Sequence, residues 1–556
     1  RDPADGPPAS HPKPGVDDAD FCTIPYGLLS LAAQALRAGH KVAVFNLSAF
    51  PWRDVDLLIR NVPGDLFGIS CLTANRRGVT ALARLIREAH PKAHIVVGGP
   101  HATALPKELL ARCPAIDMIV MGEGEATFMD LVGRLAGGEP ARGMAGAAWR
   151  NGEAIEIGPA RPRVDDLDSL ASPLDYFQSH IVLTSRGCPG QCTFCDSKTM
   201  WGRRVRFHSV AYVLDMLQKA VLGHGRRFLC VKDDTFTANR KRALAICRGI
   251  LERKLNFIWS CDTRADSLDE ELLHAMRLAG CRMLSLGVES GSPEILKNIK
   301  KNIAPERVTE VTQAAKKFGF QVRFYMMWGN RGETLATFQQ SVDLIHAAQP
   351  NQVIFTLLSV YPGTEEFDLL RQEGVFTNDV FSTKDFMTLK CFLGRSADMD
   401  EMQKRVRQFE NHLDFWDYGV EECRGILERL PNLHEAHMDL AGAYCRTGKP
   451  DLAEPHVHRA LQMGYPLPGL AFNYLACIAA GKGDFDGAKA HLARAERSYP
   501  HGVVLRNKRL LEDWLALGGP NSRQPLTLIA HNHFETVWLQ QQPEKPVPVR
   551  LSPQTL

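Results

Sequence analysis

The stretch HIVLTSRGCPGQCTFC, residues 180–195, joins an apolar strand pattern to three cysteines in the spacing Cys188-x-x-x-Cys192-x-x-Cys195. Three thiolates on one short loop can bind three irons of a [4Fe–4S] cluster and leave the fourth iron open to a small molecule. A zinc site usually takes four ligands from two separated pairs, and the sequence shows no matching second pair. A chance spacing is the remaining alternative. We therefore predict a [4Fe–4S] cluster on this loop.

The cysteine loop follows the first of six strand candidates, each an apolar run with turn residues at its end. The six are residues 180–188, 227–237, 257–266, 283–292, 321–330 and 352–360. Each of the first five leads into a helical stretch of about 15–25 residues, which is typical of βα units. Polar residues stand at the strand ends, namely Cys188, Asp234, Arg264, Glu289 and Asn330. We predict a partial (β/α)6 barrel over residues 166–392, with these side chains on its active face.

The chain before this barrel also alternates helices and strands. Strand candidates are residues 42–47, 65–73, 94–101 and 117–125, and helical candidates are 27–40, 77–90 and 105–112. Short apolar runs that end in Gly-rich turns, with amphipathic helices between them, indicate a doubly wound, Rossmann-like α/β domain. A connecting segment with a small hairpin, AAWRNGEAIEI, follows it, and we assign residues 1–165 to this domain and its connection.

After Phe392 the chain reads as helices, and two segments repeat at a spacing of 34–35 residues. The repeated positions are Gly448 and Gly483, Ala453 and Ala488, and Tyr465-Pro466 and Tyr499-Pro500. This period suits helix pairs like those of tetratricopeptide repeats. Two repeats are fewer than such arrays need alone, so we expect residues 393–520 to pack on the barrel. Residues 521–556 are predicted to form a tail or an ordered strap.

Composition excludes several classes of protein. The 556 residues are 45% hydrophobic and 23% charged with a net charge of +3, which argues for neither a nucleic-acid partner nor an anionic membrane surface. No apolar run reaches the roughly 18 residues that a membrane span needs. The fourteen cysteines favour metal or redox use over a disulfide framework, because no secretory signal is evident. The first residues, RDPADGPPASHPKPG, fit neither a signal nor a transit peptide, and without an initiator Met we expect a trimmed chain.

The cysteine loop resembles that of the radical S-adenosylmethionine (SAM) superfamily, with Phe194 as the usual aromatic before the last cysteine, and the resemblance covers residues 180–365. It implies that the open iron binds the amino and carboxylate groups of SAM. It also implies that one electron cleaves SAM to a 5′-deoxyadenosyl radical. The cofactor performs this chemistry and the protein orients it.

The same resemblance assigns SAM contacts at the strand ends. Asp233 and Asp234 fall where the second strand of the family faces the SAM amino group, and Arg264 matches the SAM carboxylate as a bidentate partner. Glu289 and Ser290 resemble the element that binds the ribose. Gly329 to Glu333 resembles the turn near the adenine, but reads Gly-Asn-Arg-Gly-Glu instead of Gly-x-Pro-Gly-Glu, which puts direct contacts of Asn330 and Arg331 in doubt. For each lone acidic residue the alternative is a helix cap or a solvated charge.

The segment Trp201-Gly202-Arg203-Arg204-Val205-Arg206 is similar to one found in radical SAM proteins with a cobalamin-type domain. We expect the Trp beside the cluster and the arginines paired with phosphate or carboxylate. A solvated basic turn is the alternative.

The first domain resembles the cobalamin-binding domain that precedes such barrels. The resemblance places Leu72, Thr73 and Asn75 near the lower face of the cobalt, and Gly98, Gly99, Pro100, His101, Gly122, Glu123 and Gly124 in turns that hold the nucleotide tail. Glycine there lets the backbone approach the ligand. The chain lacks an Asp-x-His-x-x-Gly motif, so no histidine is offered as lower axial ligand, and the first strand is not legible before Tyr26. A relic domain without cobalamin is the alternative.

These resemblances imply a cobalamin-dependent radical SAM methyltransferase that uses a 5′-deoxyadenosyl radical and methylcobalamin to methylate an unactivated carbon. The alternatives are a non-methylating cyclase or rearranging enzyme with the same domains, and a partner-binding scaffold with a vestigial barrel. The implied partners are a small-molecule, peptide or carrier-bound substrate and an electron donor such as flavodoxin or ferredoxin. Because exposed clusters of this type are oxygen-labile, a reducing cytoplasm is the expected location.

Overall fold

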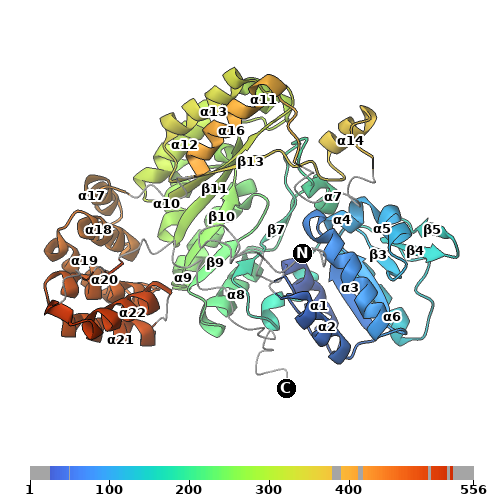
Figure 1. Ribbon diagram of the computed structural model, residues 1–556, viewed down its shortest axis with the longest axis horizontal. Helices are drawn as coiled ribbons and strands as arrows, with labels where there is room; N and C mark the ends of the chain where they lie inside the picture. Colours follow the sequence, from blue (N-terminus) through green and yellow to red (C-terminus); the bar gives the residue numbers. More distant parts are fainter. Residues whose placement is uncertain are drawn as a thin grey trace.

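The computed structural model describes residues 25–48, 50–377, 390–410, 418–498, 502–521, 526 and 528–529. A six-stranded sheet lies in the middle, with a smaller α/β domain on one side and a group of helices on the other (Figure 1). Among the described residues, no helix has the length and apolar character of a membrane span.

The N-terminal domain is built on a five-stranded sheet with the strand order β1-β2-β3-β4-β5. Strands β1 (Leu66–Ser70), β2 (His94–Gly98) and β3 (Met118–Val120) are parallel, whereas β4 (Ala147–Asn151) and β5 (Ala154–Ile157) are antiparallel. The predicted hairpin therefore exists, and it extends this sheet as its last two strands. Three of the four predicted strands of this domain are confirmed.

Helices cover both faces of this sheet, as expected for a doubly wound domain. Helices α2 (Trp52–Asn61), α3 (Arg76–Ala89) and α5 (Pro106–Arg112) pack on one face, against Ile95, Val97 and Ile119. Helix α6 (Gly124–Ala136) packs on the other face, against Val96, Met118 and Val120. Helix α1 (Tyr26–Arg37) lies against α6.

The predicted strand 42–47 is wrong, because these residues join no ladder in the described part of the chain. Val42 and Val44 instead pack against a small cluster that contains Leu29 and Phe177. An apolar run indicates that a segment is buried. A β-strand also needs a neighbouring strand to pair with, and the residues of the run itself do not specify that pairing.

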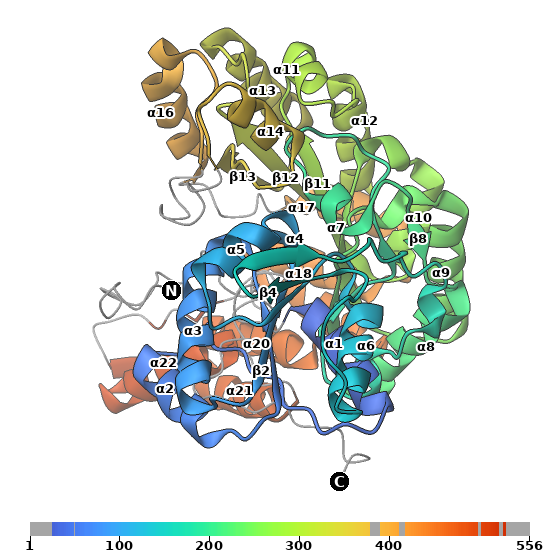
Figure 2. The same cartoon turned by 90° about the vertical axis from the view of Figure 1, so that its right-hand side faces the viewer.

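The central sheet holds six parallel strands in the order β13-β12-β11-β10-β9-β6. They are β6 (Ile181–Val182), β9 (Phe228–Val231), β10 (Ile258–Thr263), β11 (Cys281–Glu289), β12 (Gln321–Trp328) and β13 (Gln352–Leu357). All six lie within the predicted ranges, or within two residues of them. Helices α8 (Val210–Gln218), α9 (Arg240–Glu252), α10 (Glu270–Leu278), α12 (Pro305–Lys317) and α13 (Leu335–Ala348) join them, so the partial barrel is confirmed. Seen from the side of the N-terminal domain, α8, α9, α10 and α12 follow one another along the outer curve of this barrel (Figure 2).

A two-stranded ribbon brackets the cysteine loop. Strand β7 (Ser185–Arg186) leaves the sheet after β6 and pairs antiparallel with β8 (Arg206–Phe207). The short helix α7 (Ser197–Trp201) lies between them in sequence. Both ends of the cysteine loop are therefore fixed by backbone hydrogen bonds.

The C-terminal region is helical. Its elements are α16 (Met399–Glu410), α17 (Val420–Arg429), α18 (His434–Arg446), α19 (Pro450–Gln462), α20 (Pro468–Gly481), α21 (Phe485–Ser498) and α22 (Gly502–Ala516). Gly448 and Gly483 have φ values of +70° and +79° in the turns after α18 and α20, a conformation that favours glycine. The repeated pair Tyr499-Pro500 lies outside the described residues.

These helices dock on the barrel at the end where its strands begin. Arg277 pairs with Glu435 at 2.7 Å, and Arg282, at the start of β11, pairs with Asp439 at 2.5 Å. The Tyr418 hydroxyl donates to the carbonyl of Phe320, just before β12. The expected packing on the barrel is confirmed, and its place is the edge opposite the cysteine loop.

Most of the predicted tail, residues 521–556, lies outside the described residues, but Ile529 is held in place. Its carbonyl accepts from the amides of Asn473 (3.1 Å) and Asn507 (2.9 Å), and its N–H donates to Asn507 Oδ1 at 2.8 Å. Ile529 therefore contacts both α20 and α22 through these two asparagines.

Candidate functional site

Cys188, Cys192 and Cys195 are half-buried on the loop after β7, whereas most other cysteines of the described chain are buried. A Cβ added at Gly190 would lie 3.3 Å from Cys188 Sγ and 3.8 Å from Cys192 Sγ, so a larger residue would crowd both sulfurs. Gly187, with φ +94°, makes the turn that leads into the loop. Three partly accessible thiols on one loop, two of them beside Gly190, fit a cluster that takes one thiolate per iron. The described residues contain no group of three or more His, Cys, Asp or Glu arranged for a single metal ion.

Two cations lie beside these thiols. Burial raises the pKa of Cys192, and the nearby Lys301 ammonium opposes that effect. Arg264 lies close by, since its Nη1 is 3.7 Å from the Cβ position at Gly190. Positive charge beside the loop favours thiolates over thiols.

Lys301 was not identified from the sequence. It sits in a Lys-rich stretch that reads as a solvated surface turn, yet its side chain is only 8% exposed. Its neighbours Lys300 and Asn302 have φ values of +54° and +48°, a left-handed turn that directs Lys301 inward. No local signal could have placed this ammonium group at the site.

Glu289 ends β11 in a strained conformation. Its φ is +71°, and the ladder with β12 is irregular between Gly287 and Glu289. The carboxylate accepts from Lys301 Nζ at 3.0 Å. A non-glycine residue held in this region costs about 1–3 kcal/mol, and such strain clusters at ligand sites.

Arg264 and Asp234 lie on the same end of the sheet. Arg264 donates to Asp266 at 3.0 and 2.7 Å and to the carbonyl of Lys301 at 3.1 Å. Asp234 accepts from Ser197 Oγ at 2.6 Å, and burial raises its pKa. Of the strand ends that the sequence assigned to the active face, Asp234, Arg264 and Glu289 therefore lie close to the cysteine loop.

Asp233 and Ser290 do not face this site. Both oxygens of Asp233 accept hydrogen bonds from Thr184 and Ser185, and the residue is 1% exposed. Ser290 is fully buried and accepts from the backbone N–H of Ser292. Successive side chains of an extended chain point to opposite sides, so Asp234 and Glu289 face the loop while their neighbours support it. The SAM contacts predicted for Asp233 and Ser290 find no support in this geometry.

The turn after β12 is organised by Glu333. Its Oε2 accepts from the backbone N–H groups of Gly329 (2.6 Å) and Asn330 (3.0 Å), and burial raises its pKa to about 7. Asn330 is fully buried, and its Oδ1 has no hydrogen-bond partner in the described structure. Arg331 is directed away, to Glu366 at 2.6 Å.

In the N-terminal domain, the predicted cobalamin residues lie where β1 and β2 end. Asn75 Oδ1 accepts from the N–H of Leu72 (2.8 Å), and its amide donates to the carbonyl of Ser70 (3.2 Å), which fixes the loop. The Leu72 side chain stays exposed at 40%. An exposed leucine on a fixed loop is a suitable apolar contact for a flat ligand.

The turn after β2 requires glycine, and its histidine faces inward. Gly99 has φ +100°, and a Cβ there would lie 2.8 Å from the carbonyl oxygen of Cys71. Gly98 closes β2, and Pro100 opens the short helix α4 (Pro100–Ala104). His101 is 5% exposed, with Nδ1 3.2 Å from Thr73 Oγ1, and burial lowers its pKa to about 4. His101 is therefore neutral and supports the loop from behind.

The turn after β3 differs from the prediction. Gly122 donates its N–H to Thr103 Oγ1 at 3.0 Å. Glu123 pairs with Arg206 of β8 and accepts from the N–H of Val164 at 3.0 Å, so its carboxylate is directed at the barrel domain. A Cβ at Gly124 would lie 3.2 Å from Leu31 Cδ2, so this glycine lets α6 approach α1. Glu123 and Gly124 thus join parts of the protein, a role that depends on contacts distant in sequence.

The Trp201 segment is held by carboxylates of the same chain. The Arg186 guanidinium lies 5.1 Å from the centre of the Trp201 ring. Arg204 pairs with Asp165 at 3.1 Å on the surface, and Arg206 pairs with Glu123 in the interior. The expected pairing of arginines with carboxylate is confirmed for these two.

A cavity of about 290 Å³ lies between the two α/β domains. It is lined by Tyr26, Ile181, Leu183, Ser185, Trp201, Lys232 and Asp234. Tyr26 comes from α1 of the first domain, and the other residues come from the barrel. Most of the lining is apolar, with Asp234 and Lys232 as its charged groups. Such a lining suits an organic ligand held beside the strand ends.

Comparisons with known families match both α/β domains. Residues 182–345 match the radical SAM superfamily, and residues 12–132 match the B12 binding domain.

Three relatives are similar over most of this region. An uncharacterized methyltransferase of Pyrococcus horikoshii is 31% identical over 61% of this chain and 77% of its own length. The cytidylyl-2-hydroxyethylphosphonate methyltransferase of Streptomyces wedmorensis is 27% identical over 64% and 78%. The anaerobic magnesium-protoporphyrin IX monomethyl ester cyclase of Rubrivivax gelatinosus is 25% identical over 65% and 68%.

Among solved structures, the fold resembles the cobalamin-dependent SAM radical enzyme OxsB with aqua-cobalamin and SAM bound. The TM-score is 0.52 at 16% identity, over 94% of this chain and 82% of that chain.

Proposed function

This chain belongs to the radical SAM superfamily, in the branch with a B12 binding domain before the barrel, and from that membership we propose that it methylates an unactivated carbon of its substrate. Its cofactors are a [4Fe–4S] cluster, SAM and cobalamin. The observation that carries the proposal is the cavity at the ends of the barrel strands, which is lined by Asp234 and Trp201 of the barrel and by Tyr26 of the first domain.

When bound, the cluster and one SAM supply a 5′-deoxyadenosyl radical, and cobalamin carries a methyl group taken from a second SAM. Cys188, Cys192 and Cys195 would hold three irons. Asp234 would accept from the SAM amino group, and the Arg264 guanidinium would donate to the SAM carboxylate. In our proposal Glu289 and the turn at Gly329 would face the ribose and the adenine, and the buried Glu333 would fix that turn through the N–H groups of Gly329 and Asn330. Asp233 and Ser290 support these residues from behind.

The residues that would hold cobalamin stand at the ends of β1 and β2. The exposed Leu72 would provide an apolar contact, and Thr73 and Asn75 would shape its loop. The turns at Gly98, Gly99, Pro100 and Gly122 admit the nucleotide tail close to the backbone. His101 is bound to Thr73 and would fix the loop rather than serve as a ligand of the cobalt.

The electron balance identifies a further partner. One SAM gives up its methyl group, and the other accepts one electron and leaves as methionine and 5′-deoxyadenosine after taking a hydrogen atom from the substrate. Restoring both metal centres takes two electrons per methyl group, which a flavodoxin- or ferredoxin-type donor supplies. We place the reaction in a reducing cytoplasm, because a partly exposed cluster is oxygen-labile. The substrate is a small molecule, a peptide or a carrier-bound group.

The test uses SAM labelled as CD3 in an anaerobic incubation with the reconstituted enzyme, a reductant and a metabolite extract. We expect S-adenosylhomocysteine, 5′-deoxyadenosine and one compound that gains a CD3 group. If 5′-deoxyadenosine forms and a compound is consumed without gaining CD3, methylation is refuted. That result would favour the cyclase or rearranging alternative, to which the similarity with the Rubrivivax gelatinosus cyclase points.

We propose that the C-terminal helices are tetratricopeptide-like pairs that cap the barrel, and that the domains follow the boundaries 1–165, 166–392 and 393–520. The buried pair Arg277–Glu435 ties them to the end of the barrel opposite the cysteine loop. A scaffold with a vestigial barrel would not need three cysteines in the spacing of Cys188, Cys192 and Cys195. Removal of residues 400–556 tests this, since iron binding by a stable truncated protein would assign these helices to partner or substrate binding.

A further inference from the structure

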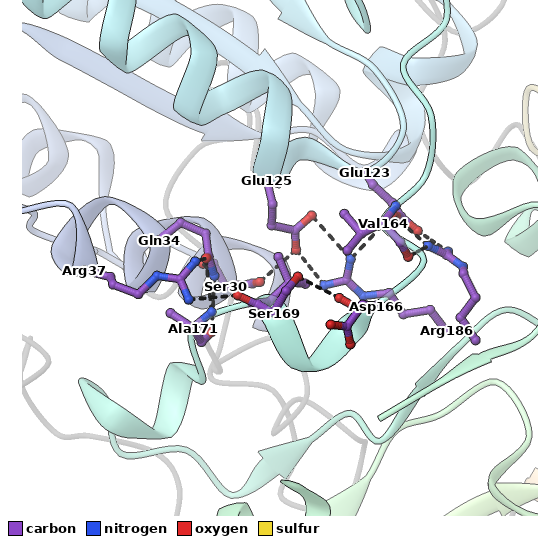
Figure 3. A network of polar contacts seen from close by, with 12 residues as sticks. Ser30, Gln34, Arg37, Glu123, Glu125, Val164, Asp166, Ser169, Ala171 and Arg186 are labelled. Atoms are coloured by element: carbon purple, nitrogen blue, oxygen red, sulfur yellow. Dashed lines mark hydrogen bonds and ion pairs between the residues drawn. The ribbon is translucent and has the colours of Figure 1, made fainter. Parts of the chain in front are cut away.

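Two buried ion pairs connect the N-terminal domain to the barrel. Arg186 Nη2 lies 2.6 Å from Glu125 Oε1, with side-chain exposures of 6% and 7%. Arg206 pairs with Glu123, with exposures of 3% and 4%. Arg186 also lies 3.8 Å from Glu123, so the four side chains form one network without net charge. Figure 3 shows the two glutamates and Arg186 meeting between the domains.

The positions of these four residues are specific. Arg186 is in β7, two residues before Cys188, and Arg206 is in β8, at the other end of the same loop. Their two partners, Glu123 and Glu125, stand at the first turn of α6, directly after β3. Each end of the cysteine loop is thus tied to the edge of the sheet where cobalamin is proposed to bind.

Further contacts restrict how these groups can move. The Ser30 hydroxyl of α1 donates to Glu125 at 2.7 Å, and the Arg186 guanidinium lies 5.1 Å from the centre of the Trp201 ring. A planar guanidinium bound to a carboxylate and stacked on an indole has a defined orientation as well as a defined distance. Burial by itself would raise the pKa of Glu125, but the charge of Arg186 together with the hydrogen bonds from Arg186 and Ser30 outweighs burial, and the pKa is lowered. The pair therefore stays ionised at neutral pH.

Stability alone does not explain charges in this place. Replacing a buried ion pair by apolar residues of similar volume is often neutral or stabilising, because two charges must be removed from water. What a buried, bidentate pair provides is a unique geometry. A reaction that uses two cofactors in one turnover needs such a geometry, since a displacement of about 1 Å can cost about 100-fold in rate.

We propose that the Arg186–Glu125 and Arg206–Glu123 pairs position the cluster loop relative to the cobalamin domain and so fix the distance between the two cofactors. This inference rests on the proposed function, because it assumes that both cofactors act on one substrate. The four side chains are positioning residues and touch neither cofactor nor substrate.

The test measures the distance directly and needs no substrate. Cob(II)alamin and the reduced [4Fe–4S] cluster are both paramagnetic, so pulsed EPR reports their spin–spin coupling in the full-length protein. We compare the wild type with R186M/E125Q, which removes both charges while the new glutamine still accepts from Ser30 and the new methionine fills the space over Trp201. R186K keeps the charge but loses the planar fork. The control is R204M/D165N, which removes the exposed ion pair of the same loop, with exposures of 78% and 77%.

We expect one defined coupling in the wild type and in the control. In R186M/E125Q, with iron and cobalt contents unchanged, we expect a broad or shifted coupling, and in R186K an intermediate one. A wild-type coupling in R186M/E125Q would overturn the inference and leave the proposed function intact. If the couplings change as expected and no substrate ever gains a methyl group, the proposed function fails and the positioning role stands.

Discussion

The Glu333 carboxyl, in the turn after β12, is expected to make the unfolding free energy depend on pH, and replacing Glu333 by Gln should abolish this contribution. Glu333 is fully buried after β12, and burial raises its pKa from an ordinary 4.5 to about 7. The folded state therefore binds the proton more tightly than the unfolded state. For such a group, stability is lost as the pH rises from the unfolded pKa through the folded one. The full effect corresponds to about 3 kcal/mol, at about 1.4 kcal/mol per pKa unit.

The assay is urea unfolding of the wild type and E333Q, followed by tryptophan fluorescence at about pH 5.5 and about pH 8. Linkage predicts that between these values the Glu333 carboxyl removes about 2 kcal/mol from the unfolding free energy of the wild type. Gln keeps an oxygen for the N–H groups of Gly329 and Asn330 and does not titrate. The difference between the two proteins should therefore shift by about 2 kcal/mol in favour of E333Q as the pH rises.

The control variant is E310Q, at an exposed helix position (side chain 65% exposed). Its unfolding free energy should differ from that of the wild type by the same amount at both pH values. If E333Q also shows a constant difference from wild type at both pH values, Glu333 is ionised throughout, and the argument from burial is refuted.

Three further changes test other parts of the structure. C192S should lower the iron content of the reconstituted protein from about four to near zero, because one of three cluster ligands is lost. The control C445S, at a half-buried cysteine of α18, should keep its iron. Full iron in C192S by metal analysis would disprove the ligand assignment. E435L should lower the unfolding free energy by about 3–5 kcal/mol, because it leaves the Arg277 charge buried without its partner, and R277M/E435L should recover most of that loss. Equal losses in the single and the double variant, measured by urea unfolding, would contradict the account of a buried pair. N507L should speed hydrogen exchange at the Ile529 amide by roughly tenfold, because about one hydrogen bond is lost. Unchanged exchange would show that other contacts hold Ile529.

The sequence by itself determined the barrel and its cysteine loop. The six barrel strands appear as apolar runs that end in polar residues, a pattern that depends only on neighbours along the chain. The spacing from Cys188 to Cys195 is fixed by the covalent chain, so it does not depend on how distant segments pack. The same local logic placed the hairpin and the turns at Gly448 and Gly483, where only residues a few positions apart interact.

Only the tertiary structure decided which neighbouring side chain faces the site. Asp233 and Asp234 are equivalent in the sequence, yet one binds Thr184 and Ser185 while the other lines the cavity. Lys301 reads as a surface lysine, but a left-handed turn buries it beside Glu289. These outcomes depend on the pleat of a strand and on single φ angles, which residue type specifies only weakly.

The largest differences concern contacts between residues far apart in the chain. Glu123 reads as part of a nucleotide-binding turn, but its partner Arg206 is 83 positions away and belongs to another domain. The run 42–47 has strand composition and joins no ladder in the described structure. The C-terminal helices dock where the barrel strands begin, through pairs such as Arg277–Glu435 that are 158 positions apart. Burial pattern and covalent spacing are local properties, whereas an ion pair or a strand neighbour exists only once distant segments have met, and for that reason these features were decided by the tertiary structure alone.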